Sequence, residues 1–302
     1  MSIKKQKLLG LIPFFLIFIL TLSGCGNKKV NVTSQKLNVI TTTDFYGEVA
    51  NAVVGNQGSV SSIINNPAID PHDYEPTTKI AKQVSQADIV VANGLGYDAW
   101  MNKLNKQDQA AYIKIGEDVM NKTTGDNPHL WYNPTTMTKY ANYLAKELAK
   151  KDPQHKTYFE KNAAKYIASL KPVQSEVATL KQTAQKTTNK KVYVSEPVFD
   201  YSLQAIGFTV ANKNFEKAVE NGTDPSPAVI KQMQDGIKAK RIAFLVFNTQ
   251  TDSKLVNNLV QLAQKNNVPV LKVTETLPAG KTYQSWMLSQ YKALNKILQN
   301  EG

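Results

Sequence analysis

The middle of this 302-residue chain carries a long helical pattern of apolar residues that divides the sequence into two halves. Apolar side chains recur at alternating steps of four and three, at Phe159, Ala163, Tyr166, Leu170, Val173, Val177, Leu180 and Ala184. This spacing places them on one face of a helix of about 30 residues, which would span roughly 45 Å. Pro153 suits the first helical position after a cap at Asp152. Pro172 predicts a kink or a break near Leu170.

On both sides of this helix, strand-like and helix-like segments alternate. In the first half we predict strands at 37–43, 59–64, 88–92 and 111–115, and helices at 44–54 (with Asp44 as a candidate cap), 78–86 and 97–105. In the second half we predict strands at 191–195, 208–211, 241–247 and 268–273, and helices at 199–206, 228–239, 253–266 and 283–299. Such alternation is typical of an α/β fold with mainly parallel sheets. We therefore predict an N-terminal domain at 37–151, a connecting helix at 152–188 and a C-terminal domain at 189–302.

The N-terminus has the pattern of a signal peptide. Lys4, Lys5 and Lys7 precede an apolar run at 8–22, which suits a signal peptide and is short for a membrane span. Leu22-Ser23-Gly24-Cys25 closes the run, and Cys25 is the only cysteine, which excludes a disulfide framework and a cysteine-rich zinc site. This step resembles the bacterial lipoprotein box, which implies cleavage after residue 24 and lipidation of Cys25. Residues 25–36 would then be a flexible tether on the extracytoplasmic face of the cell membrane. An ordinary secreted protein is the alternative.

The positive charge of the chain is spread over lysines. The net charge is +12, and cleavage after residue 24 removes three lysines, which leaves 278 residues and a charge of +9. Arg241 is the only arginine, and the sequence has no arginine-rich or aromatic-interleaved basic stripe. We therefore expect no nucleic-acid partner. A lysine-rich solvated surface beside an anionic membrane and wall is the simpler interpretation.

Two of the three histidines stand in near-duplicate, proline-stiffened segments. These segments are Asp70-Pro71-His72-Asp73-Tyr74-Glu75-Pro76 and Asn127-Pro128-His129-Leu130-Trp131-Tyr132-Asn133-Pro134. Proline fixes its own φ and restricts the residue before it, so each imidazole is held on a stiff loop. Repeated rigid presentation of a scarce ligand residue indicates a metal site. The third, His155, is expected to be a solvated surface residue.

The candidate donors follow the predicted strands. In an open α/β sheet, ligands bind beyond the carboxyl ends of the strands. His72 and His129 follow strands of the first half, and Glu196 and Glu275 follow strands of the second half. Two imidazoles would thus face two carboxylates across a cleft. Two nitrogens and up to four oxygens suit a divalent transition ion of intermediate hardness.

These residues carry a family resemblance. The Pro-His frames, the central helix, the Asp224-Pro225-Ser226-Pro227 step and the lipoprotein box resemble the metal-binding lipoproteins of bacterial manganese and zinc ABC importers. The resemblance implies two (β/α) domains joined by one long rigid helix, with the ion in the cleft between them. It also implies delivery of the ion to a membrane permease that is driven by a cytoplasmic ATPase. We expect a monomer without enzymatic activity.

Carried over residue by residue, the resemblance implies His72 and His129 as the first two ligands. The third ligand falls on Glu196, and the fourth, usually an aspartate, falls on Glu275, for which a helix cap is the alternative. Glu196 and the lack of a histidine-rich loop favour Mn²⁺, with Zn²⁺ as the alternative because zinc binds most such sites more tightly. Asn127 and Asn133 replace aspartates that are usual near the second histidine. An amide there can still accept a hydrogen bond from imidazole.

Two other functions compete with metal capture. A secreted metallohydrolase needs an open coordination position and a general base, and the sequence has no HExxH helix. A surface adhesin needs an exposed binding patch, and the sequence shows no repeats or stalk. An extracytoplasmic solute-binding lipoprotein for a divalent metal is therefore the predicted function, with no catalytic residues.

Overall fold

The computed structural model describes Ser2 and residues 36–105 and 110–300. The predicted signal peptide, Cys25 and nearly all of the predicted tether therefore lie outside the described residues. The described residues from 36 to 300 form one compact unit. No helix in the described part of the chain is long and apolar enough to cross a membrane.

The first domain is built on a four-stranded parallel sheet in the order β2-β1-β3-β4. The strands are β1 (Leu37–Thr43), β2 (Gly58–Ile64), β3 (Ile89–Ala92) and β4 (Ala111–Lys114). Because successive side chains point to opposite faces, Val39 and Val91 enter the main core while Ile40 and Val90 enter a separate apolar cluster. Burial on both faces explains the apolar runs of these central strands.

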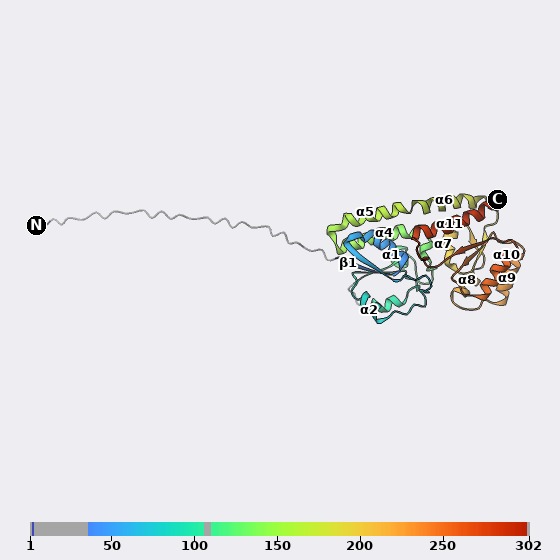
Figure 1. Ribbon diagram of the computed structural model, residues 1–302, viewed down its shortest axis with the longest axis horizontal. Coiled ribbons are helices and arrows are strands. Elements are labelled where there is room, and N and C mark those ends of the chain that lie inside the picture. The colour runs from blue at the N-terminus through green and yellow to red at the C-terminus, as the bar shows by residue number, and fades with distance from the viewer. Residues whose placement is uncertain (1, 3–35, 106–109, 301–302) are drawn as a thin grey trace. The chain divides into compact units, whose positions relative to one another are not determined.

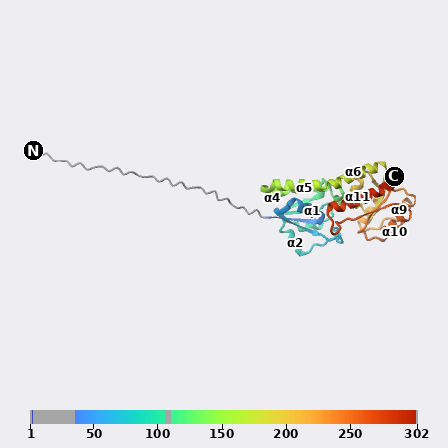
Figure 2. The ribbon, with the colours of Figure 1, turned by 45° about the horizontal axis from the view of Figure 1, so that its top comes forward.

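Helices cover both faces of this sheet. The main-core face is covered by α1 (Asp44–Val54), α4 (Thr136–Lys151) and α5 (Lys156–Ser169), which contact one another. The smaller cluster lies under α2 (Thr78–Val84) and α3 (Trp100–Leu104). Figures 1 and 2 show α2 on the side of the sheet away from α1 and α5.

The second domain repeats the same strand order, β6-β5-β7-β8. Its strands are β5 (Lys191–Val194), β6 (Thr209–Val210), β7 (Leu245–Asn248) and β8 (Val270–Val273). Its helices are α7 (Asp200–Ile206), α8 (Lys213–Glu220), α9 (Pro227–Lys238), α10 (Lys254–Lys265) and α11 (Tyr283–Asn300). Neighbouring strands in both sheets run parallel, as the alternating sequence pattern predicts.

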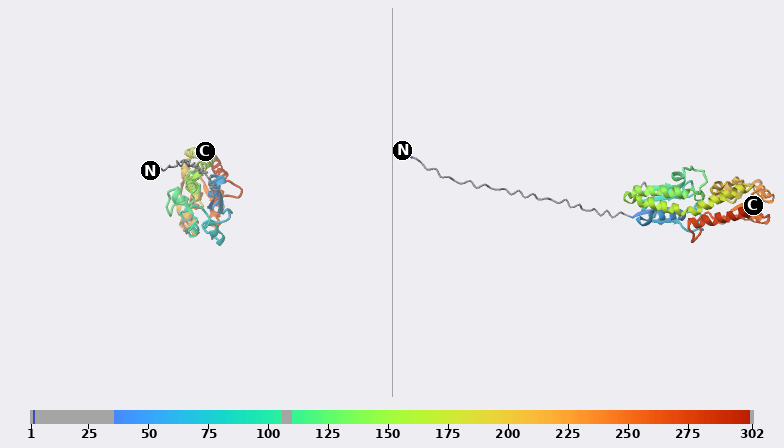
Figure 3. Two further views of the ribbon diagram at one scale, coloured as in Figure 1. Left: turned by 90° about the vertical axis from the view of Figure 1, so that its left-hand side faces the viewer. Right: turned by 90° about the horizontal axis from the view of Figure 1, so that it is seen from above.

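The connecting helix is broken where the sequence predicts. Its first helix, α5, ends at Ser169, and α6 (Lys171–Lys186) begins after Leu170 with Pro172 in its first turn. Proline has no N–H to donate to the preceding turn, so the hydrogen-bond ladder cannot continue unchanged. A short 3₁₀ turn, Pro153–His155, precedes α5. Figure 3 shows α5 and α6 following one another along the two domains.

The two domains share a continuous apolar core. Tyr132 of the first domain packs against Phe199 and Trp286 of the second, with ring centroids 5.0 and 5.7 Å apart. Glu48 of α1 accepts a hydrogen bond of 2.7 Å from the backbone N–H of Tyr283, the first residue of α11. This contact ties α1 to the start of α11 and satisfies a backbone N–H that has no partner inside the helix.

Several predicted boundaries were wrong. Helices α4 and α8 were not predicted, and the strand predicted at 241–247 is shorter, at Leu245–Asn248. Thr43, not Asp44, is the residue before α1, and its side chain makes no capping hydrogen bond. The helix predicted at 97–105 begins only at Trp100, because Gly94, Leu95 and Gly96 all adopt positive φ and form a turn after β3.

Candidate metal centre

The first histidine is held by a turn that its own sequence creates. Asp70 Oδ1 accepts a hydrogen bond of 2.8 Å from the backbone N–H of His72. The carbonyl of Pro71, between them, accepts one of 3.1 Å from Trp100 Nε1. The His72 ring meets the edge of Tyr97, with centroids 4.6 Å apart. The loop is therefore fixed on both sides of the imidazole.

The second histidine is held in the same way. Asn127 Oδ1 accepts a hydrogen bond of 2.9 Å from the backbone N–H of His129, and the Pro128 carbonyl accepts one of 2.9 Å from Asn93 Nδ2. The matching Asp-Pro-His and Asn-Pro-His sequences thus fold into matching turns, in which the side chain before proline binds the backbone of the histidine. The sequence repeat is a structural repeat.

Asn127 also sets which nitrogen of His129 is free. Its amide Nδ2 donates to the carbonyl of Pro197 at 2.7 Å, which orients Oδ1 toward His129 Nδ1 at 2.8 Å. Since an amide oxygen can only accept, this contact favours the tautomer with the proton on Nδ1 and the lone pair on Nε2. The contact agrees with the expectation that the Asn127 amide can accept a hydrogen bond from the imidazole.

The carboxylate of Glu275 meets the histidines from the second domain. Tyr97 donates its hydroxyl to Glu275 Oε1 at 3.0 Å, and this oxygen lies 3.7 Å from His129 Nε2. The backbone N–H of Glu275 donates to Gln250 Oε1 at 2.7 Å. Glu275 follows β8 and precedes α11 by a loop, so the alternative that it caps a helix is wrong.

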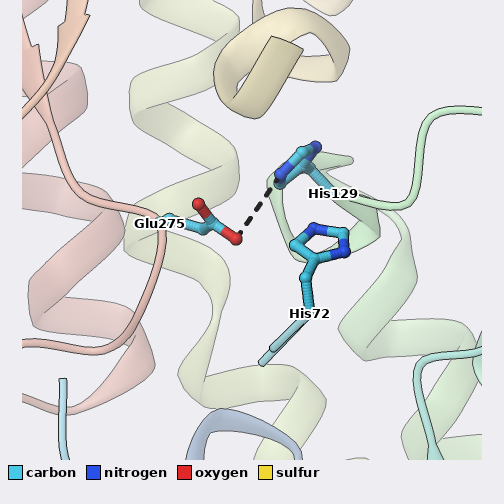
Figure 4. Close-up of side chains that lie close together, drawn as sticks. All are labelled: His72, His129 and Glu275. Atoms are coloured by element: carbon cyan, nitrogen blue, oxygen red, sulfur yellow. Dashed lines mark ion pairs between the residues drawn. The ribbon is translucent and has the colours of Figure 1, made fainter. Parts of the chain in front are cut away.

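His72, His129 and Glu275 converge on one point (Figure 4). One ligand atom from each residue can be chosen so that all three lie within 4.8 Å of one another. The three residues come from loops after β2, β4 and β8, at the carboxyl ends of parallel strands, as predicted from the sequence. Two imidazole nitrogens and a carboxylate form a donor set that divalent transition ions accept.

The fourth predicted donor, Glu196, does not join this group. It lies two residues after the end of β5, but its Oε2 accepts hydrogen bonds from Asn248 Nδ2 at 2.7 Å and from the hydroxyl of Thr251. It still lines the same cavity as Glu275. The structure therefore brings three of the four sequence-predicted donors together and holds the fourth beside them.

The charges in this centre depend on one another. Burial lowers the pKa of His129, but the adjacent Glu275 and the charges of Glu220 and Glu196 outweigh it and raise this pKa overall. Burial raises the pKa of Glu275, but the contact with His129 and the charges of both imidazoles hold it below its usual value. Burial is also the main cause that lowers the pKa of His72 and raises that of Glu196. The centre thus favours an ionised Glu275 beside a His129 that readily takes up a proton. A divalent cation can take the place of that proton.

Glu275 and the neighbouring Glu196 line a cavity of about 660 Å³. Residues of both domains line it, including Pro67 to Pro71 of the first and Gly222 to Pro225 of the second. Its acidic lining residues are Asp70, Glu196, Asp224, Asp252 and Glu275, and none of the described residues that line it is lysine or arginine. On a chain of net charge +12, this cavity is a local region of negative potential.

Three residues around the centre were missed by sequence reasoning. Tyr97 binds Glu275, Gln250 holds the Glu275 loop, and Glu220 Oε1 lies 3.8 Å from His129 Nδ1. Tyr97 had a usable signal, since it follows β3 in a glycine-rich turn at the same sheet edge. Gln250 and Glu220 had none, because their roles depend on how the domains pack.

The fold and site together define a two-domain α/β protein of the solute-binding type, with its donors in the cleft between the domains. Residues 39–297 match the ZnuA family, described as zinc-uptake complex component A periplasmic, and the chain belongs to that family.

Similar proteins agree with this assignment. The manganese ABC transporter substrate-binding lipoprotein PsaA of Streptococcus anginosus is 28% identical over 93% of this chain and 96% of its own length. The metal ABC transporter substrate-binding lipoprotein of Lactococcus lactis is 27% identical over 97% of this chain and its whole length. The fold resembles that of FpvC of P. aeruginosa, solved with Ni²⁺, with a TM-score of 0.73, 21% identity, and coverage of 89% of this chain and 98% of that one. It also resembles the Cd-bound periplasmic metal-binding protein of Candidatus Liberibacter asiaticus (TM-score 0.68, 19% identity, coverage 87% and 100%).

Proposed function

We propose that this protein captures a divalent transition metal ion outside the cytoplasm and delivers it to the permease of an ABC importer with a cytoplasmic ATPase. The observation that carries the proposal is the convergence of His72, His129 and Glu275 at the cleft between the domains. The family and the names of the relatives support transport rather than hydrolysis or adhesion.

The ion that we favour is Mn²⁺, with Zn²⁺ as the alternative. Glu275 contributes hard oxygen, and Glu196 can add more if its side chain turns from Asn248 and Thr251 toward the ion. The S. anginosus relative is named for manganese, which supports this choice. Glu196 is thus proposed as the fourth donor, recruited from a position on the cavity wall.

The proposed location is the extracytoplasmic face of the cell membrane, with a lipid on Cys25 as the anchor. The relatives are named lipoproteins, which supports this location. We expect Cys25→Ala to release the protein from membranes while metal binding stays unchanged, because the centre is far along the chain from residue 25. Fractionation with mass analysis checks this, and firm membrane retention of a cleaved, unlipidated chain would contradict it.

The three histidines supply an internal test of the function. We expect His72→Ala and His129→Ala each to abolish tight Mn²⁺ binding. Removal of one donor from so small a set costs roughly 3 to 5 kcal/mol of binding free energy. His155→Ala is the matched control, because His155 pairs with Asp152 in the turn before α5 and takes no part in the centre.

Metal analysis of the purified wild type, followed by calorimetry on the three variants, decides the question. Wild-type affinity in His72→Ala or His129→Ala would remove that residue from the centre. Wild-type protein that binds neither Mn²⁺ nor Zn²⁺ would end the proposal.

A further inference from the structure

His129 lies between two carboxylates of the second domain. Glu275 Oε1 is 3.7 Å from Nε2, and Glu220 Oε1 is 3.8 Å from Nδ1. Only about 2% of the His129 side chain is exposed, so neither charge is well screened by water. Each nitrogen of one imidazole therefore faces its own negative charge.

Glu220 reaches this position because of α8, of which it is the last residue. Phe215 and Glu216 of this helix are buried, and Glu220, one turn after Glu216, lies on the same face. The Glu220 side chain is 22% exposed, and the chain that follows it, from Gly222 to Pro225, lines the cavity. A residue of the second domain thus contacts the histidine of the first.

The two carboxylates have opposite effects on the proton of a neutral imidazole. Glu275 favours a proton on Nε2, the nitrogen that faces the other donors, and a protonated Nε2 cannot bind a metal ion. Asn127 favours a proton on Nδ1 through its 2.8 Å contact. Its amide is neutral, however, and does not offset the negative charge that Glu275 places on the Nε2 side. Glu220 supplies a full negative charge on the Nδ1 side.

We propose that Glu220 is a positioning residue for the metal centre. Together with Asn127, its charge keeps the His129 proton on Nδ1, so that Nε2 presents its lone pair to the ion. Carboxylates that act on metal-bound histidines in this way typically change metal affinity 10- to 100-fold. The benefit to metal capture rests on the proposed function, whereas the placement of the proton does not.

The first test uses the metal-free protein. The ¹⁵N shifts of the His129 ring report the tautomer, at a pH high enough for the ring to carry a single proton. We expect the Nδ1–H form to dominate in the wild type and the Nε2–H form to rise in Glu220→Gln, which keeps the size and removes the charge. Asp224→Asn is the matched control, because Asp224 lines the same cavity, whereas the described carboxylates that pair with His129 are Glu220 and Glu275.

The second test is calorimetry with Mn²⁺. We expect Glu220→Gln to weaken binding about 10- to 100-fold, and Asp224→Asn less than threefold. An unchanged tautomer in Glu220→Gln, an affinity equal to wild type, or an equal loss in both variants would overturn the proposal. If the wild type binds no metal, the proposed function fails, and the tautomer measurement alone decides the role of Glu220.

Discussion

Replacement of Tyr97 by phenylalanine tests whether the ion centre depends on one buried hydroxyl. Tyr97 is fully buried, and its hydroxyl donates to Glu275 Oε1 at 3.0 Å. Its ring packs against His72 and Trp131 at 4.6 and 5.0 Å between centroids. Phenylalanine keeps these ring contacts and removes only the donor. The change therefore frees one carboxylate oxygen without opening a cavity.

The size of the effect follows from the chemistry of the contact. A hydrogen bond to a charged acceptor contributes about 1.5 to 3 kcal/mol. If this hydrogen bond holds the carboxylate in the position that binds the ion, its loss weakens binding about 10- to 100-fold, since about 1.4 kcal/mol corresponds to tenfold. The range agrees with that for other residues that orient metal ligands. Glu275 keeps its backbone contact with Gln250, so the loop itself stays in place.

Calorimetric titration of Mn²⁺ into the wild type, Tyr97→Phe and Tyr74→Phe measures this loss. Tyr74 is the control, because its ring packs on Trp100 at 4.8 Å beside the His72 loop while its hydroxyl makes no hydrogen bond to another described residue. We expect wild-type affinity in the control. An affinity of Tyr97→Phe within twofold of the wild type would refute the argument that this hydroxyl orients Glu275.

Three further predictions concern charge. Glu196→His should raise the ratio of Zn²⁺ to Mn²⁺ affinity, because imidazole suits tetrahedral zinc better than manganese; an unchanged ratio in competition titrations would exclude Glu196 as a donor. The raised pKa of His129 means that protons compete for it already above pH 6.5, and the lowered pKa of His72 means that they compete for it only below that pH. Metal affinity should therefore decrease as the pH is lowered. Above pH 6.5 only the proton on His129 competes with the ion, and below pH 6.5 the proton on His72 competes as well, so the decrease becomes steeper. Calorimetry from pH 8 to 5.5 checks this change of slope. Burial raises the pKa of Glu216 from 4.5 to about 7, so this group contributes stability that is fully present below pH 4.5 and lost as the pH rises through 7, on the order of 3 kcal/mol. The wild type should therefore lose this stability between pH 4.5 and 8, whereas Glu216→Gln, which cannot ionise there, should not. Urea denaturation measures the difference in free energy of unfolding between the two proteins, and a difference that does not change with pH would contradict the prediction.

The positions of the donors could be predicted because strand ends are encoded locally. A β-branched or apolar run marks a parallel strand, and the loop after its carboxyl end faces the ligand side of the sheet. His72, His129 and Glu275 all follow such runs, and they meet in the structure. The Asp-Pro-His and Asn-Pro-His turns are equally local, since each closes through a bond two residues away.

The rest depends on packing that the sequence does not mark. Helix α4 was overlooked because the segment opens with an asparagine, one proline and two threonines, which suggest a loop. Its apolar stripe of Met137, Tyr140, Leu144 and Leu148 also lies among lysines. Glu196 follows its strand as predicted, but Asn248 and Thr251, on distant segments, hold its carboxylate away from the histidines. Glu220 gained a role only through the unpredicted helix α8.

The repeated strand order has a consequence for how an ion would act on the chain as a whole. Each sheet offers its carboxyl edge to the cleft, and neither sheet alone supplies both imidazoles and a carboxylate. A bound ion would therefore work as a reversible cross-link between two similar halves. At a free concentration of 100 times its Kd it would add about 2.7 kcal/mol to the assembled state. It would add much less to either half by itself, because the first half supplies only the two imidazoles and the second only a carboxylate.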